Sequence, residues 1–160
     1  MIKIKQLIFS FIFLCIFSLS ACDSNRVFEQ NVDIPNNNWR IGDTKEFRFE
    51  ITDTTKTYQV FFNIRNALFY EYYNLYISAT LLDPDGQKLH NKLHEMFLMD
   101  KKTGAPLGKG AGDIFDHSVL ALKNQHFTKP GTYTLKFTQY MRKNPLPGIM
   151  AVGIKVVAAE

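Results

Sequence analysis

Hydrophobic and polar residues alternate with a period of two through most of the chain. The alternation is clear in 45–51, where phenylalanine and isoleucine alternate with glutamate and arginine, and it recurs in 57–66 and 72–82. Because successive side chains of a strand point to opposite faces, this period predicts strands that each bury one face. The aromatic and β-branched residues in these segments favour the same structure. The side chains expected to face the core are Phe47, Phe49, Ile51, Tyr58, Val60, Phe62, Ile64, Tyr73, Leu75, Ile77, Ala79 and Leu81.

Turn signals separate these segments from further strands. Asp83–Gly86 (DPDG) is a strong turn, because proline presets one φ angle and glycine accepts a positive one. Gln87–Asp100 is ambiguous between a helical spacing and a buried strand, and we interpret it as a returning strand. Residues 103–113 contain four glycines and a proline and are expected to form a loop. The other expected strands are 118–122, 132–141, with Tyr133, Leu135, Phe137 and Met141 facing inward, and 149–157.

These patterns predict an all-β fold. About eight short strands with turns between them, and no convincing long helix, indicate an antiparallel β-sandwich of the jelly-roll or immunoglobulin-like type.

The start of the chain carries a different pattern. Lys3 and Lys5 precede the apolar run 7–17, which is too short to cross a hydrocarbon core of about 30 Å as a helix. The run leads into Leu-Ser-Ala-Cys, which resembles a bacterial lipobox whose cysteine is acylated. We therefore expect 1–21 to be a lipoprotein signal peptide and Cys22 to be the lipidation site. The alternative is an ordinary secretory signal followed by a chance cysteine.

The mature chain is expected to contain a lipidated N-terminal tether and leading segment (22–44), with a first edge strand, and a β-sandwich domain (45–160). Cys15 leaves with the signal, so Cys22 has no disulfide partner and stability must come from core packing. Several acyl chains on one cysteine give firm membrane attachment. Asp23 favours inner-membrane retention in enteric bacteria, a rule that other phyla do not share. We expect a lipid-anchored protein of the cell envelope, on the periplasmic side of the outer membrane.

Composition and charge exclude several classes of protein. Apolar residues make up 46% and charged residues 21% of the chain, which excludes a disordered or collagen-like protein. The formal charge of +4 includes Lys3 and Lys5; without them 17 basic residues face 15 acidic ones, a balance of about +2. That charge is too weak and too evenly spread to indicate a nucleic-acid partner.

The glycine-rich segment 104–113 does not match a nucleotide-binding loop. A P-loop places four residues between its first glycine and the Gly-Lys pair, followed by serine or threonine. Here Gly104 and Gly108 enclose three residues, and Lys109 is followed by Gly110. We therefore expect a mobile surface loop and no nucleotide.

The titratable residues give no clear catalytic or metal site. His90 and His94 lie four apart, but Glu95 follows the second histidine rather than the first, unlike a zincin helix. A second cluster consists of Asp113, Asp116 and His117, a spacing that is common by chance. Ser118 lacks a nucleophile elbow. We expect no metal, no cofactor and no enzymatic activity.

The aromatic residues are more informative. Five of the eight residues in 69–76 are phenylalanine or tyrosine, and alternation prevents one strand from burying all of them on one face. Exposed tyrosines suit protein interfaces or sugar stacking. The candidate partner-binding residues are Arg65, Tyr70, Tyr72 and Tyr76, with Phe61 expected on the same side. The alternative is that these rings cover a second core or the tether.

The order of several motifs resembles the gliding-motility lipoprotein family GldH. The motifs are the lipobox, Arg26-Val27-Phe28-Glu29, Asn37-Asn38-Trp39, Asn63-Ile64-Arg65-Asn66, Tyr72-Tyr73-Asn74-Leu75-Tyr76, Gly108-Lys109-Gly110, Pro130-Gly131-Thr132-Tyr133 and Gln139-Tyr140-Met141-Arg142. The resemblance implies a lipoprotein of Bacteroidota that is required for gliding, a movement linked to the type IX secretion system. It implies no catalytic residues.

The leading hypothesis is a non-catalytic, membrane-anchored component that binds other envelope proteins of the gliding or secretion apparatus. Its expected partners are membrane lipid, through acylated Cys22, and those proteins, with no nucleic acid and no nucleotide. The alternative hypothesis is a carbohydrate-binding lipoprotein module, and a hydrolase of the envelope ranks third because no acid–base pair stands out.

Overall fold

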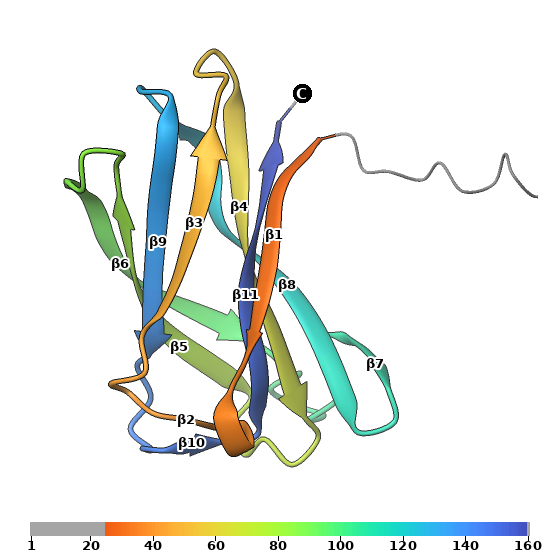
Figure 1. Cartoon of the computed structure of the whole chain (residues 1–160). Helices are drawn as coiled ribbons and strands as arrows, with labels where there is room; N and C mark the ends of the chain where they lie inside the picture. The colour runs from red at the N-terminus through yellow and green to blue at the C-terminus, as the bar shows by residue number, and fades with distance from the viewer. Residues whose placement is uncertain (1–24, 160) are drawn as a thin grey trace, which may run out of the picture.

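Two antiparallel β-sheets pack face to face and enclose the core (Figure 1). The computed structural model describes residues 25–159. One sheet has the strand order β1-β11-β4-β8-β7, the other has the order β3-β9-β5-β6, and the short strands β2 and β10 form a separate pair. The strands are β1 (Arg26–Asp33), β2 (Asn38–Trp39), β3 (Lys45–Ile51), β4 (Thr57–Ala67), β5 (Asn74–Leu82), β6 (Lys88–Phe97), β7 (Lys109–Ala111), β8 (Ile114–His126), β9 (Gly131–Gln139), β10 (Leu146–Pro147) and β11 (Ile149–Ala158). This arrangement confirms the predicted antiparallel β-sandwich, with more strands than expected.

The core lies between the two sheets and is rich in aromatic rings. Every side chain that the alternation in 45–82 assigns to the core is buried, except Tyr73. Phe137 of β9 joins the layers, because its ring stacks on Phe47 of its own sheet at 5.3 Å and meets Phe62 of the facing sheet edge-on at 5.0 Å. Such ring pairs add about 0.5–1.5 kcal/mol each beyond the burial of their area.

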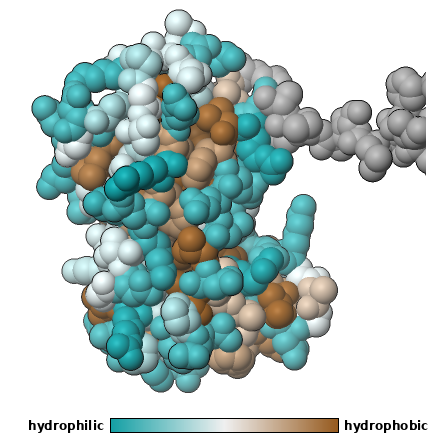
Figure 2. Space-filling model, viewed as in Figure 1, coloured by the Kyte–Doolittle hydropathy of each residue, from teal (hydrophilic) through white to brown (hydrophobic). Residues whose placement is uncertain are grey.

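The sandwich begins before residue 45. Strand β1 pairs with β11 as an edge strand, and the 3₁₀ helix η2 (Pro35–Asn37) leads to the fully buried Trp39. The leading segment therefore belongs to the domain, since Phe28 packs on Phe49 of β3 with 6.2 Å between ring centroids. Figure 2 shows hydrophobic side chains in a band down the middle of the visible face, where β1 and β3 lie next to each other in Figure 1.

The ambiguous segment 87–100 contains the strand β6, as predicted. A helix would place Leu89, Leu93 and Met96 on one buried face. In the structure only Met96 is buried, whereas the two leucines are exposed on a strand. Strand β8 is longer than the predicted 118–122, because it pairs with β4 over nearly the whole length of both strands. The predicted loop 103–113 includes the short strand β7, which pairs with the start of β8.

Two aromatic or apolar positions differ from the expected inward orientation. Tyr73 is 37% exposed because it lies in the loop before β5, which begins at Asn74. Met141 follows the end of β9 and only packs against the edge of the core. The period of two does not extend past the paired part of a strand, so the loop conformation sets the orientation of both side chains.

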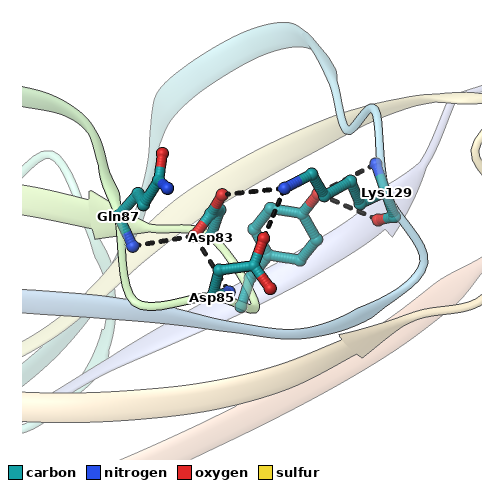
Figure 3. A network of polar contacts seen from close by, with 5 residues as sticks. Asp83, Asp85, Gln87 and Lys129 are labelled. Carbon is teal, nitrogen blue, oxygen red and sulfur yellow. Dashed lines mark hydrogen bonds and ion pairs between the residues drawn. The ribbon is translucent and has the colours of Figure 1, made fainter.

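A polar corner joins the β5–β6 turn to the β8–β9 turn (Figure 3). The Asp83 carboxylate is nearly buried and accepts hydrogen bonds from the backbone N–H groups of Asp85 (3.0 Å) and Gln87 (2.8 Å). Lys129 forms ion pairs with both Asp83 and Asp85, and its carbonyl accepts a hydrogen bond of 2.9 Å from the Tyr133 hydroxyl. The predicted DPDG turn is thus bound to the neighbouring turn.

The predicted signal peptide (1–21) and the lipidation site Cys22 lie outside the described residues. Across residues 25–159, no helix has the length and apolar character needed to cross a membrane.

Candidate functional site

Tyr70 is a core residue and offers no contact surface. Its side chain is 3% exposed, its hydroxyl donates a hydrogen bond of 2.8 Å to the Asn74 carbonyl, and burial raises its pKa. Tyr72 is half-buried and meets the Tyr70 ring edge-on at 5.7 Å. The loop between β4 and β5 turns these two rings towards the domain, so Tyr70, one of the candidate partner-binding residues, covers the core instead, which is the alternative that the sequence left open.

Tyr76 lies on the outer face of the four-stranded sheet, opposite Glu95 on β6. Its hydroxyl donates to Glu95 Oε1 at 2.8 Å, and the Asn74 amide donates to the same oxygen at 2.7 Å. These two hydrogen bonds lower the pKa of Glu95, and the bond to Glu95 raises the pKa of Tyr76. The phenol is therefore held in a fixed orientation on the surface.

Further exposed side chains surround Tyr76. We call this group the tyrosine surface, and its members are Tyr73, Tyr76, Leu93, Phe97 and Tyr140. Tyr140 is 62% exposed and continues the ladder beyond β9, because its N–H donates to the Tyr76 carbonyl at 2.8 Å. Tyr73 stacks on Phe97 with centroids 6.1 Å apart, and Lys101 Nζ lies 5.4 Å from the Tyr73 ring. These rings form a mixed apolar and polar patch on one sheet.

Arg65 and Phe61 do not share the face of the tyrosines, so this expectation is wrong. Both lie on β4 and point outward from the five-stranded sheet, whereas Tyr76 points outward from the other sheet. The outer faces of a sandwich point in opposite directions. Arg65 binds Asp116 through two hydrogen bonds of 2.8 and 3.1 Å, which raise the pKa of the guanidinium, and Lys155 Nζ lies 4.7 Å from the Phe61 ring.

The histidine and aspartate clusters do not converge. His117 is buried, with Nε2 at 2.7 Å from the Asn66 amide oxygen, whereas Asp116 points outward to Arg65. His94 faces the core and meets the Phe62 ring edge-on at 5.1 Å, while Glu95 lies on the opposite face. In the part of the chain that the structure describes, no three His, Cys, Asp or Glu side chains are placed to hold a metal ion.

Glycines of the 103–113 segment allow close packing at the edge of the sheet. A Cβ at Gly108 would lie 2.6 Å from the Asp116 carbonyl oxygen and 2.7 Å from the His117 ring. A Cβ at Gly110 would overlap the Phe115 ring. The close approach of β7 to β8 therefore explains these two glycines without a phosphate ligand.

Comparison with known proteins decides the family. A protein-family model described as GldH lipoprotein matches residues 26–156, from the first residue of β1 into β11. The chain belongs to the GldH lipoprotein family. A gliding motility lipoprotein GldH homolog of Christiangramia forsetii is 33% identical over 160 residues, covering 96% of this chain and 96% of its own length. The gliding motility lipoprotein GldH of Flavobacterium johnsoniae is 26% identical over 135 residues, covering 84% of this chain and 82% of its own.

Among solved structures, a chain of the T13 viral particle of infectious bursal disease virus aligns with a TM-score of 0.37 and 14% identity. The alignment covers 87% of this chain and 33% of the viral one.

Within this GldH-family chain, sequence patterns identified only part of the tyrosine surface. Tyr76 was a candidate, but Leu93, Phe97 and Tyr140 come from β6 and from the segment after β9. The hydrophobicity of Leu93 and Phe97 at outward positions of β6 is a signal that the sequence contains. This signal places the two residues beside Tyr76 only when the pairing of β6 with β5 is known.

Proposed function

We propose that this chain is a lipid-anchored envelope protein that acts in gliding motility as a non-catalytic, protein-binding component. Cys22 supplies the anchor, and the tyrosine surface binds other proteins of the gliding and type IX secretion apparatus. The protein sits in the outer membrane and faces the periplasm. Membership in the GldH lipoprotein family, and the names of the two relatives, support the role in gliding.

The single observation that carries the binding role is the exposure of the tyrosine surface. Leu93, Phe97 and Tyr140 expose 56%, 50% and 62% of their surface around a Tyr76 phenol that two strands hold in place. Aromatic side chains are enriched at protein interfaces, where they anchor the centre of the contact. Glu95 and Lys101 add charges at the border of the patch, which favours a defined orientation of the partner.

The polar contacts support a non-catalytic role. The Asp116 carboxylate is engaged by Arg65 and the His117 ring by Asn66, so these neighbours share no proton. General acid–base catalysis needs a titratable group within hydrogen-bond reach of its reacting partner, in a site that a substrate can enter. His117 is buried, and its Nε2 is already held by the Asn66 amide oxygen.

Cross-linking in living cells tests the proposal. A tagged copy at the native locus would be compared with a Leu93→Ser, Tyr140→Ser double variant after light cross-linking. We expect the variant to retain about a tenth or less of the captured gliding or secretion proteins, because loss of anchors at an interface costs more than 1 kcal/mol each. Leu89→Ser with Leu120→Ser is the matched control, since these exposed leucines lie outside the tyrosine surface.

Two results would contradict the proposal. Equal capture by both double variants would exclude the tyrosine surface as the contact. Capture of bulk outer-membrane proteins alone, at the same level in a Cys22→Ala strain, would exclude a membrane-anchored role in the apparatus. Colony spreading of each strain on agar reports whether the loss of capture also reduces motility.

A further inference from the structure

The outer face of the five-stranded sheet contains an open hollow of about 630 Å³. Side chains of four adjacent strands form most of its lining, because residues at alternate positions of β1, β11, β4 and β8 point outward together. Leu107 and Phe97, the latter also a member of the tyrosine surface, form an apolar rim where the chain crosses from the other sheet. This volume lies in the range of pockets that bind small molecules.

Cross-strand register places polar groups in rows over the hollow. One row runs from Asn31 through Gly153 and Asn63 to Ser118. Gly153 is essential to this row, because a Cβ there would overlap the Asn31 amide oxygen and the Gln30 carbonyl oxygen. The missing side chain thus lets the Asn31 amide lie across β11.

The next row places Arg65 between two carboxylates, those of Asp33 and Asp116. Asp33 of β1 lies opposite Ala151, and Ala151 lies opposite Arg65, whose neighbour across the ladder is Asp116. Ala151, like Gly153, is a small residue, so β11 forms a shallow floor between the longer side chains of β1 and β4.

Part of this array is fixed and part has free hydrogen-bonding capacity. The Asn63 amide donates to Glu29 at 2.9 Å and accepts from the Ser118 hydroxyl at 3.0 Å. By contrast, the side chains of Asn31 and Asp33 form no hydrogen bond with any other residue in 25–159. The hollow therefore offers an amide and a carboxylate beside a pre-oriented polar network.

The charges of the hollow balance. Its acidic side chains are Glu29, Asp33 and Asp116, and its basic side chains are Arg65, Lys109 and Lys155. Three negative and three positive groups leave no net attraction for a polyanion or for a cation. A ligand of this hollow must instead satisfy many separate donors and acceptors without carrying a charge of its own.

We propose that this hollow binds a neutral oligosaccharide. Vicinal hydroxyl groups both donate and accept hydrogen bonds, so they match neighbouring amides, carboxylates and a guanidinium. The apolar rim supplies surfaces for the C–H faces of sugar rings. A protein partner fits less well, because protein interfaces centre on apolar anchors and this floor is polar.

Binding of defined oligosaccharides tests the proposal. The lipidated full chain, held in a detergent without a sugar headgroup, would be titrated with cellopentaose, maltopentaose, xylopentaose and chitopentaose while backbone amide NMR shifts are followed. At least one of these is expected to cause saturable shifts in 31–33, 63–65 and 116–118. The double change Asn31→Ala, Asp33→Ala should weaken that binding at least about tenfold with an unchanged melting temperature, because neither side chain bonds to the fold.

The control is Ser78→Ala with Thr134→Ala on the outer face of the other sheet, which should leave the affinity unchanged. Absence of saturable shifts with all four sugars up to about 10 mM would overturn the proposal. So would shifts that persist in the Asn31→Ala, Asp33→Ala variant, or tighter binding of pentagalacturonate than of every neutral sugar. Capture through the tyrosine surface is measured with variants of Leu93 and Tyr140, which do not line the hollow, so either result stands without the other.

Discussion

Gly153 shows how one residue shapes a whole face of the domain. It lies on β11 of the five-stranded sheet, between β1 and β4, and a side chain there would collide with the backbone of β1. We expect Gly153→Ala to lower the free energy of unfolding by about 1–3 kcal/mol, because the strand must shift to admit the methyl group. Urea unfolding of the domain measures this loss.

The control for Gly153→Ala is Gly42→Ala, where a Cβ would meet no atom within 4 Å. This change should alter the free energy of unfolding by less than about 0.5 kcal/mol. Equal losses for the two variants would show that the packing over Gly153 is loose.

Three histidines make stability depend on pH. Burial lowers the pKa values of His90, His94 and His117 below 6.5, so the folded state keeps these rings neutral. As the pH falls below about 6.5, the histidines of the unfolded chain take up protons while those of the folded protein remain neutral. The free energy of unfolding therefore decreases until the pH reaches the lower pKa values of the folded state. We expect the melting temperature to fall between about pH 7.5 and pH 5.

The variant His117→Gln should reduce this pH dependence, because the amide can still bond to Asn66 but does not titrate. Thr128→Gln, at an exposed position, changes no titratable group; it is the control and should leave the dependence unchanged. A melting temperature that is constant across the range would contradict the neutral, buried state of the rings.

At the scale of elements, the corner in Figure 3 links two turns that are distant in sequence. Asp83→Ala would leave the N–H groups of Asp85 and Gln87 without their acceptor, and we expect it to cost about 1–3 kcal/mol of the free energy of unfolding. Asp85→Ala removes an exposed ion pair with Lys129 and should cost less than about 1 kcal/mol. Thermal unfolding of both variants compares them, and a larger loss for Asp85→Ala would contradict this ranking.

The elements that alternation predicted well are those that bury one face in the core. Strands β3, β4 and β5 appear where the period of two is clear, because core contact on one side forces that period. Strand β1 is harder to recognise, since it lies at an edge and exposes most of its side chains. The length of β8 depends on its partner β4, which no local pattern contains.

At the scale of the whole molecule, the candidate contact residues separate according to topology. Arg65 and Tyr76 lie eleven positions apart in sequence, yet the β4–β5 connection crosses from one sheet to the other. Sequence identified the residue types suited to binding, but only the sheet order assigns them to opposite outer faces. The hollow could not be predicted for the same reason, because most of its lining comes from four strands whose register is a tertiary property.

The early start of β1 has a geometric consequence for a chain acylated at Cys22. Only residues 23–25 separate that cysteine from Arg26, so the two Cα atoms can be at most about 14 Å apart. The start of β1, together with the end of β11 that pairs with it in Figure 1, would then rest close to the lipid headgroups. Partners that travel within the same membrane leaflet would therefore reach the domain by lateral diffusion.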